Sequence, residues 1–180
     1  MKPVFLDRDG VIVRDSDDYL RSADALEPLP GAIEALVKLA RAGASLVVVS
    51  NQQGVSLGYF PESELALMEA KIQAWLLPYD VTIARFEHAT ALANTGDRRR
   101  KPEPGMLLDA AQTLSFDLAG CFLVGDRESD MGAALACGVR PLLVLTGKTG
   151  PEGWKSWKSQ PEAVFVGLPE AADYILSEQR

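Results

Sequence analysis

Short runs of apolar residues alternate with segments of helical periodicity along most of the chain. The runs are rich in Val, Leu, Ile and Phe and are bounded by turn residues; they are Pro3–Leu6, Ser45–Val49, Val81–Phe86, Cys121–Val124 and Leu142–Leu145. Runs of this kind are typical of strands that are covered on both faces of a parallel sheet. We therefore predict one strand at each run.

Between the runs, apolar residues recur at the three- and four-residue spacing of a helix face. The predicted helices lie between Pro30 and Gly43, between Pro61 and Pro78, over Met106–Leu114, and over Met131–Leu135 with Gly138 after its end. Proline and glycine at these positions are typical of helix ends. Alternating strands and helices predict an α/β fold, a Rossmann-like doubly wound parallel sheet, with residues 1–180 in a single domain.

Two segments do not fit this alternation. Val11–Glu27 is acidic and partly apolar, and Gly147–Pro161 is rich in Gly, Lys, Ser and Trp. We predict loops or small lids at the edge of the sheet for both.

The composition limits the cellular location and the classes of binding partner that we expect for this protein. Apolar residues make up 47% of the chain, charged residues 24%, and the net charge is -7, so we expect no disorder of the whole chain and no binding of nucleic acid or of anionic lipid. No apolar run approaches the ~18 residues of a membrane span. The first strand begins at Pro3, which leaves no room for a signal peptide, and Cys121 and Cys137 lie among apolar residues. We therefore expect a cytoplasmic protein with two buried, reduced thiols.

Polar residues gather where the predicted strands end. They are Asp7 and Asp9 after the first run, Ser50 and Asn51 after the second, Asp126 and Asp130 after the fourth, and Arg100 and Lys101 ahead of the third helix. Because ligands bind beyond the carboxyl ends of the strands in an open parallel sheet, we expect these residues to share one site.

Carboxylates packed in a cleft repel one another unless a cation neutralises them. Oxygen ligands and a site that can keep several waters favour Mg²⁺. Asp7 is then a candidate nucleophile that forms an aspartyl-phosphate, and Asp9 a candidate acid and base for the leaving alcohol and the attacking water. Ser50 and Lys101 would bind the non-bridging phosphate oxygens. An isolated Asp-x-Asp-Gly is more often a turn, but the joint order of the motifs favours the catalytic interpretation.

Four segments resemble the motifs of the haloacid dehalogenase superfamily of phosphatases. They are Phe5-Leu-Asp-Arg-Asp-Gly-Val-Ile, Val49-Ser-Asn-Gln-Gln-Gly, Arg100-Lys-Pro-Glu-Pro-Gly-Met and Val124-Gly-Asp-Arg-Glu-Ser-Asp-Met. The resemblance implies a squiggle-and-flap insertion at Val11–Glu27, no large cap domain, and metal contacts from Asp7, the Asp9 carbonyl and Asp126. It also implies that Asn51 joins the phosphate site and that Asp130 supports it.

Within the superfamily, the motifs are most similar to the histidinol-phosphatase-like subgroup. This implies a small phosphorylated sugar as substrate, with the 7-phosphate of D-glycero-D-manno-heptose 1,7-bisphosphate as first candidate, in the synthesis of surface-glycan heptose. Histidinol phosphate and other small sugar phosphates are the alternatives. Arg100, Arg127 and Tyr19 would meet the rest of the substrate, since a guanidinium suits a second phosphate or sugar hydroxyls. We expect a monomer.

Members of this subgroup commonly carry a Cys-x-His…Cys-x-Cys zinc loop just before the Arg-Lys-Pro segment. His88 stands at the matching place here, but Phe86, Asp97 and Arg99 occupy the positions of thiolates. Structural zinc sites need about four such ligands. We therefore predict no zinc, and His88 as an ordinary loop residue.

Functions of other classes are also compatible with parts of the pattern. A receiver-like signalling module is also α/β and is phosphorylated on Asp with Mg²⁺, but it keeps its phosphoryl group and needs no acid at the position of Asp9. A catalytically silent binding protein is disfavoured because no motif position is lost. The sequence therefore favours a Mg²⁺-dependent phosphatase.

Overall fold

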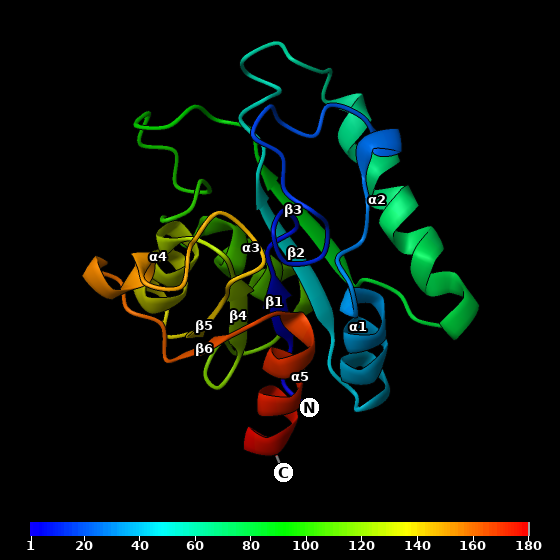
Figure 1. Ribbon diagram of the computed structural model, residues 1–180, viewed down its shortest axis with the longest axis vertical. Coiled ribbons are helices and arrows are strands. Elements are labelled where there is room, and N and C mark those ends of the chain that lie inside the picture. Colours follow the sequence, from blue (N-terminus) through cyan, green and yellow to red (C-terminus); the bar gives the residue numbers. More distant parts are fainter. Residues whose placement is uncertain (180) are drawn as a thin grey trace.

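The computed structural model describes residues 1–179 of the 180-residue chain. Its centre is a six-stranded sheet in the order β3-β2-β1-β4-β5-β6, in which every neighbouring pair is parallel (Figure 1). The strands are β1 (Val4–Leu6), β2 (Leu46–Asn51), β3 (Arg85–Ala89), β4 (Phe122–Gly125), β5 (Arg140–Val144) and β6 (Ala163–Phe165). In this doubly wound order, β2 and β3 are added on one side of β1, and β4, β5 and β6 are added on the other side. The predicted fold class is confirmed.

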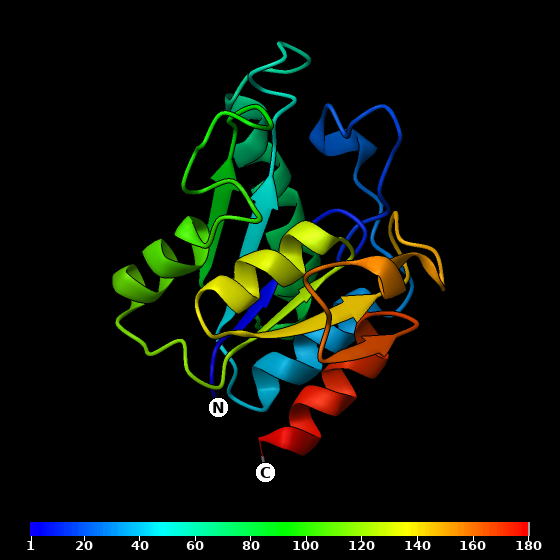
Figure 2. The ribbon, with the colours of Figure 1, turned by 90° about the vertical axis from the view of Figure 1, so that its left-hand side faces the viewer.

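Helices cover both faces of the sheet (Figures 1 and 2). The helices are α1 (Ala32–Arg41), α2 (Ser63–Leu76), α3 (Gly105–Leu114), α4 (Glu128–Ala136) and α5 (Leu168–Glu178). Apolar side chains of α1, α2 and α5 share one core cluster with one face of the sheet, and those of α3 and α4 share a second cluster with the other face.

The central strand β1 shows how the sequence builds these two layers. Its side chains alternate between the faces, so that Val4 and Leu6 enter the α1 side while Phe5 enters the α3 side. All three are fully buried. Both faces of a central parallel strand need apolar residues, which is why the strand reads as a continuous apolar run rather than as an alternation.

The structure corrects the predicted elements at two places. The predicted strand Val81–Phe86 is wrong in its start, because β3 begins at Arg85, and Val81 and Ile83 are buried in the connection before it. Because these loop residues are buried, they are apolar, and the sequence of the loop resembles that of a strand. In addition, β6 and α5 were not predicted; β6 has only three half-buried residues, too few to show a periodic pattern.

Long connections rise above the carboxyl ends of the strands (Figure 2). One is residues 11–27, called here the flap segment, which holds only the short 3-10 helix η1 (Ala23–Ala25). Others follow β2 and β3, and the loop after β5 contains the 3-10 helix η3 (Gly153–Ser156). Within residues 1–179, no helix has the length and apolar character needed to cross a membrane.

Candidate active site

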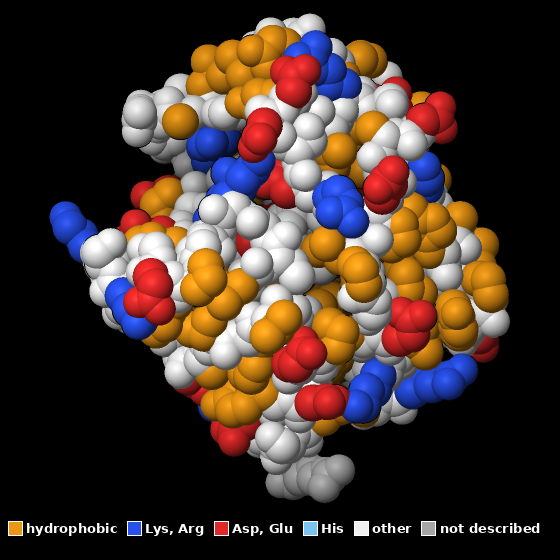
Figure 3. All heavy atoms as spheres, viewed as in Figure 1, with side chains coloured by type: hydrophobic (Ala, Val, Ile, Leu, Met, Phe, Trp, Pro, Cys, Tyr) orange, Lys and Arg blue, Asp and Glu red, His pale blue; other side chains and the backbone are white. Residues whose placement is uncertain are grey.

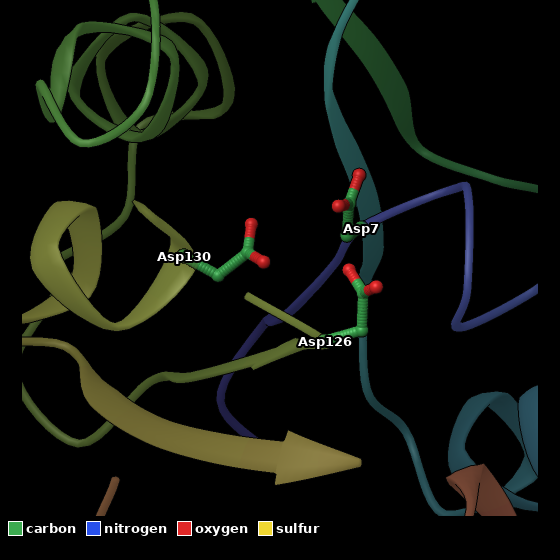
Figure 4. A group of neighbouring side chains, drawn as sticks. All are labelled: Asp7, Asp126 and Asp130. Carbon is green, nitrogen blue, oxygen red and sulfur yellow. The ribbon is translucent and has the colours of Figure 1, made fainter. Parts of the chain in front are cut away.

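Three carboxylates converge at the carboxyl edge of the sheet. Asp7 directly follows β1, Asp126 directly follows β4, and Asp130 lies in the first turn of α4. One carboxylate oxygen of each lies within 4.8 Å of the others, and Figure 4 shows Asp130 pointing toward the neighbouring Asp7 and Asp126. All three side chains are buried. Adjacent parallel strands bring them together because β1 and β4 are paired in register.

The buried ammonium group of Lys101 joins two of these carboxylates. Its Nζ lies 3.0 Å from Asp7 Oδ1 and 2.6 Å from Asp130 Oδ1, and it donates to the Val49 carbonyl at 2.8 Å. Burial lowers the pKa of Lys101, but Asp130 and Asp7 more than offset this, so that the pKa lies above its ordinary value. The lysine is therefore a fixed positive charge beside Asp7.

The side chain of Asn51 holds the backbone of Lys101 in place. Its Oδ1 accepts from the Lys101 backbone N–H and its Nδ2 donates to the Lys101 carbonyl, both at 3.0 Å. A side-chain amide that pairs with both backbone groups of one residue holds that residue in a single orientation. The end of β2 thus positions a residue from the loop that precedes α3.

Asp126 has the features of a cation ligand. Its Oδ2 accepts from the Lys148 backbone N–H at 2.8 Å, whereas its Oδ1 is buried without a hydrogen-bond partner. Burial, with Asp130 adding to it, raises the pKa of Asp126 to about 7, and burial also raises the pKa of Asp7 well above its ordinary value. An unpaired buried carboxylate oxygen is costly unless a cation meets it. Oxygen donors from Asp7 and Asp126 therefore fit Mg²⁺.

Asp9 lies beside this cluster in a different environment. Arg8 approaches it with Nε at 2.9 Å from Oδ1 and Nη2 at 3.0 Å from Oδ2, and Gln52 Nε2 donates to Oδ2 at 2.9 Å. Burial alone raises the pKa of Asp9, but Arg8 and then Gln52 lower it below its ordinary value. Gln52 Nε2 also donates to Ser50 Oγ at 2.7 Å, so one amide connects the candidate acid and base with the candidate phosphate-binding hydroxyl.

The loop after β5 packs directly against Asp126. A Cβ on Gly147 would lie 1.9 Å from Asp126 Oδ2, and one on Gly10 would lie 2.7 Å from the same atom, so both positions need glycine. Thr146 Oγ1 donates to the Gly10 carbonyl at 2.6 Å, and Thr149 Oγ1 donates to the Asp126 carbonyl at 2.5 Å. The start of Gly147–Pro161 is therefore part of the site wall.

Asp7, Asp9, Ser50 and Lys101 line the floor of a cleft of about 300 Å³, and Asp126 and Asp130 are buried beside Asp7 under this floor. The rim of the cleft is charged. On the rim, Arg127 Nη2 lies 2.7 Å from Asp15 Oδ2, and the Lys148 ammonium pairs with Asp17. Basic side chains gather beside a hollow on the face shown in Figure 3. The rim thus joins the flap segment to the loops after β4 and β5 by ion pairs.

The remaining predicted residues also reach the cleft. Arg100 lines it and donates from Nη1 to the Ala91 carbonyl at 2.9 Å. Tyr19 lines it with a backbone φ of 59°, accepts at its hydroxyl from Gln53 Nε2 at 2.6 Å, and stacks edge-on against Tyr59. The structure therefore brings all ten predicted site residues into or directly beside one cleft.

Among the residues of the site that were not predicted from the sequence, Arg8, Gln52 and Lys148 contact predicted site residues directly. Arg8 and Gln52 lie inside recognised motifs, but only the fold shows that both contact Asp9. Lys148 follows β5 in a loop without a motif, and no spacing in the sequence connects it with Asp126. The only available indication was its place just after a predicted strand end.

The segment before Lys101 does not offer a zinc-type donor set. The prediction of His88 as a loop residue is wrong, because His88 lies on β3, where its Nε2 is 2.6 Å from Glu69 Oε1. Asp97 Oδ1 accepts backbone N–H groups of Arg99 and Arg100 at 2.8 and 3.0 Å. Cys121 and Cys137 belong to or pack against the core on the α3 side of the sheet. These residues do not fit a site of four N and S ligands. The absence of zinc stays a prediction.

Comparison with known proteins gives relatives over most of the chain. The HAD-hydrolase-like family model matches residues 98–171. The chain is 38% identical over 148 residues to the D-glycero-beta-D-manno-heptose-1,7-bisphosphate 7-phosphatase of Pseudomonas putida, covering 82% of this chain and 85% of the relative. It is 36% identical to the enzyme of the same name from Bordetella bronchiseptica, covering 99% of each chain.

A solved structure is similar over nearly the full length. The crystal structure of D,D-heptose 1,7-bisphosphate phosphatase from B. bronchiseptica, in complex with magnesium and phosphate, has a TM-score of 0.90 and 32% sequence identity, and covers 99% of each chain. That protein is thus similar in fold and in sequence, and it binds the metal ion that fits the carboxylates of this chain.

Proposed function

Because the chain belongs to the haloacid-dehalogenase-like phosphatase family that includes the D-glycero-beta-D-manno-heptose-1,7-bisphosphate 7-phosphatases, we propose that it removes the 7-phosphate of D-glycero-D-manno-heptose 1,7-bisphosphate. The observation that carries this proposal is the arrangement around Asp7. A buried carboxylate at a strand end has a fixed ammonium 3.0 Å away and the half-satisfied Asp126 beside it. This arrangement suits a nucleophile that receives a phosphoryl group.

In the proposed reaction, a carboxylate oxygen of Asp7 attacks the phosphorus atom while the bond to the sugar oxygen breaks. Arg8 and Gln52 hold Asp9 as a carboxylate in this structure, so Asp9 acts as the acid only after it has taken up a proton and left Arg8. It then donates that proton to the sugar oxygen, and the sugar leaves as an alcohol. Asp9 then takes a proton from a water molecule, whose oxygen attacks the aspartyl-phosphate, so that inorganic phosphate leaves and Asp7 is regenerated. Lys101 and Ser50 hold the non-bridging oxygens, where charge lies in the transition state.

Asp7, Asp126 and the Asp9 backbone carbonyl are the proposed holders of Mg²⁺. When bound, the ion supplies positive charge that lets a phosphate dianion enter a site of three carboxylates. Asp130 is the supporting residue, since its two oxygens are already engaged by Lys101 and by the Arg127 N–H at 3.0 Å.

The rim supports the assignment of a bisphosphate. Arg100, Arg127 and Lys148 line the cleft beyond the position of the transferred phosphate, and guanidinium and ammonium groups suit a second phosphate. Tyr19 would contact the sugar. The flap function of residues 11–27, the single-domain organisation, the monomeric state and a cytoplasmic location are part of this proposal.

Steady-state rates on a panel of phosphate esters test the proposal. The panel contains heptose 1,7-bisphosphate in both anomers, histidinol phosphate, fructose 1,6-bisphosphate and glucose 6-phosphate, each with and without Mg²⁺. We expect the highest kcat/KM for the heptose bisphosphate and a requirement for Mg²⁺. A clear preference for histidinol phosphate would overturn the substrate, and equal rates without a divalent ion would overturn the metal site.

A further inference from the structure

Arg99 lies outside the cleft, next to Arg100 in sequence, and its guanidinium lies between two elements of the α/β body. We propose that Arg99 positions Arg100 and Lys101 for phosphoryl transfer by fastening residues 97–105 to β3 and α3 through ion pairs with Glu87 and Asp109. These three residues are called here the Arg99 clamp. The inference rests on the proposed function, because it assigns Arg99 to the same reaction.

The contacts of the clamp reach three parts of the chain. Arg99 Nη2 lies 2.5 Å from Glu87 Oε2 and donates to the His88 carbonyl at 3.2 Å, both on β3. Its Nη1 lies 3.1 Å from Asp109 Oδ2 on α3. A planar guanidinium can make these bonds at once because its five N–H groups form a rigid fork, which a lysine lacks.

Burial distinguishes the clamp from an ordinary surface ion pair. The Glu87 side chain is 3% exposed, and its other oxygen is paired with Arg85. A buried carboxylate that loses its cation is left with an unpaired charge, whereas exposed ion pairs contribute little. Glu87 is therefore shielded from water, and solvent cannot replace Arg99 as its partner.

Hydrogen bonds hold the backbone on both sides of Lys101, the proposed phosphate-binding lysine. Asp97 Oδ1 accepts the N–H groups of both Arg99 and Arg100, which makes a tight turn ahead of Lys101. From the opposite side, Asn51 pairs with the backbone of Lys101. The segment is thus held by the clamp on the outside and by β2 on the inside.

The close approach of Gly105 shows how tightly this segment folds. Gly105 N–H donates to the Arg98 carbonyl at 2.8 Å, and a Cβ at Gly105 would lie 2.3 Å from that oxygen. A shift of the segment would move Lys101 Nζ away from Asp7. Misplacement of a catalytic group by ~1 Å can cost on the order of a hundredfold in rate.

The clamp also accounts for the poor fit of zinc to this region. The resemblance to the subgroup's sequence motifs implies a metal loop just before Lys101, but here Asp97 and Arg99 stand at two of its ligand positions and make charged contacts of their own. In this chain, ion pairs of Arg99 with Glu87 and Asp109 thus hold residues 97–105. The thiolates that would bind zinc there are missing.

Arg98 provides a matched control within the same run. It also pairs with Asp109, at 3.0 Å, but its side chain is 68% exposed, and Glu87 pairs with Arg99 rather than with Arg98. Replacing Arg99 or Arg98 by methionine removes the same charge at adjacent positions. Only the first change leaves the buried Glu87 with one cation fewer.

The test measures kcat and KM of wild type, Arg99→Met, Arg99→Lys and Arg98→Met with p-nitrophenyl phosphate and with heptose 1,7-bisphosphate, in Mg²⁺. We expect Arg99→Met to lose about ten- to a hundredfold in kcat on both esters, with Arg99→Lys between it and wild type. Arg98→Met should stay within about twofold of wild type. In Arg99→Ala, added methylguanidinium should restore part of kcat, which a loss of folding would not allow.

Each result decides the inference. Equal kcat of Arg99→Met and Arg98→Met, or the absence of any methylguanidinium rescue in folded Arg99→Ala, overturns it. If Arg99→Met does not fold by circular dichroism, Arg99→Lys and Glu87→Gln are compared with Arg98→Met in its place. Stoichiometric zinc in the active wild type, measured by mass spectrometry, would also overturn it. A wild type without activity on any ester overturns the proposed function instead.

Discussion

The floor and the rim of the cleft hold their charges in opposite ways. On the floor, Asp126, Asp130 and Lys101 are at most 3% exposed, and their partners are fixed by backbone and side-chain bonds. On the rim, the Asp17 side chain is 99% exposed and that of Arg127 48%. Removing one member of a buried pair costs about 3–5 kcal/mol, whereas an exposed pair contributes about 0–1 kcal/mol.

This difference suggests that the floor determines the type of reaction, whereas the rim determines the choice of substrate. Charges that cannot leave the floor define where a phosphorus atom and its cation must lie. On the rim, Lys148 can exchange Asp17, whose side chain is 99% exposed, for an anionic group of a substrate at little cost, since water already reaches this ion pair. We therefore expect changes on the floor to abolish turnover, and changes on the rim to alter KM and selectivity.

The largest expected effect comes from Asp7→Asn, which removes the proposed nucleophile and keeps its shape. We expect kcat to fall by about 10⁴-fold or more, while the thermal midpoint stays equal or rises. Asp7 differs from an ordinary buried ion-pair partner because burial and the neighbouring carboxylates raise its pKa in spite of Lys101, and because Lys101 keeps its ion pair with Asp130 when Asp7 is replaced. Activity assays and thermal unfolding without metal measure the two quantities. A variant with more than about one hundredth of wild-type kcat would show that the floor does not define the reaction.

The protonation of Asp126 gives the next effect, on stability without Mg²⁺. Burial raises its pKa to about 7 from an ordinary value of 3.8, so the folded state binds this proton more tightly than the unfolded state. The resulting stability is present at low pH and is lost as pH rises toward 7. We expect metal-free protein to lose about 1–3 kcal/mol between pH 5 and 7.5 from this group.

Thermal unfolding at the two pH values, with and without Mg²⁺, tests this sign. Mg²⁺ should raise the midpoint more at pH 7.5 than at pH 5, because it takes the place of the proton. The Asp126→Asn variant should lose most of this pH dependence. An equal effect of Mg²⁺ at both values in wild type would contradict the assignment of Asp126 as a ligand.

A substitution on the rim tests the same comparison between floor and rim. Lys148→Ala removes an ammonium from the rim but keeps the Lys148 N–H that donates to Asp126 Oδ2. We expect KM for heptose 1,7-bisphosphate to rise about tenfold, kcat to change little, and KM for p-nitrophenyl phosphate to stay near wild type. A tenfold loss of kcat on both esters would instead place Lys148 on the floor.

The sequence predicted residues at strand ends better than residues that act through side-chain contacts, for a physical reason. Asp7 and Asp126 follow apolar runs, and parallel strands must end at a common edge, so their meeting could be inferred before the structure. Arg8, Lys148 and Arg99 act through contacts with residues far along the chain or through their side-chain orientation, which spacing does not fix. The same holds for β6 and α5, which are stabilised by packing on β5 and α1 rather than by a strong pattern of their own.

The smallest expected effect concerns Asp17, the exposed partner of Lys148. Its ion pair competes with a substrate phosphate for the same ammonium, so Asp17→Asn should lower KM for the bisphosphate, by about twofold at low ionic strength. The gain should vanish at about 0.5 M salt, because water and ions screen exposed charges. Asp18→Asn, on the neighbouring exposed carboxylate that pairs with Arg21 instead, is the matched control. A higher KM in Asp17→Asn would mean that Asp17 holds the flap segment in its binding position, and the rim would then share the rigidity of the floor.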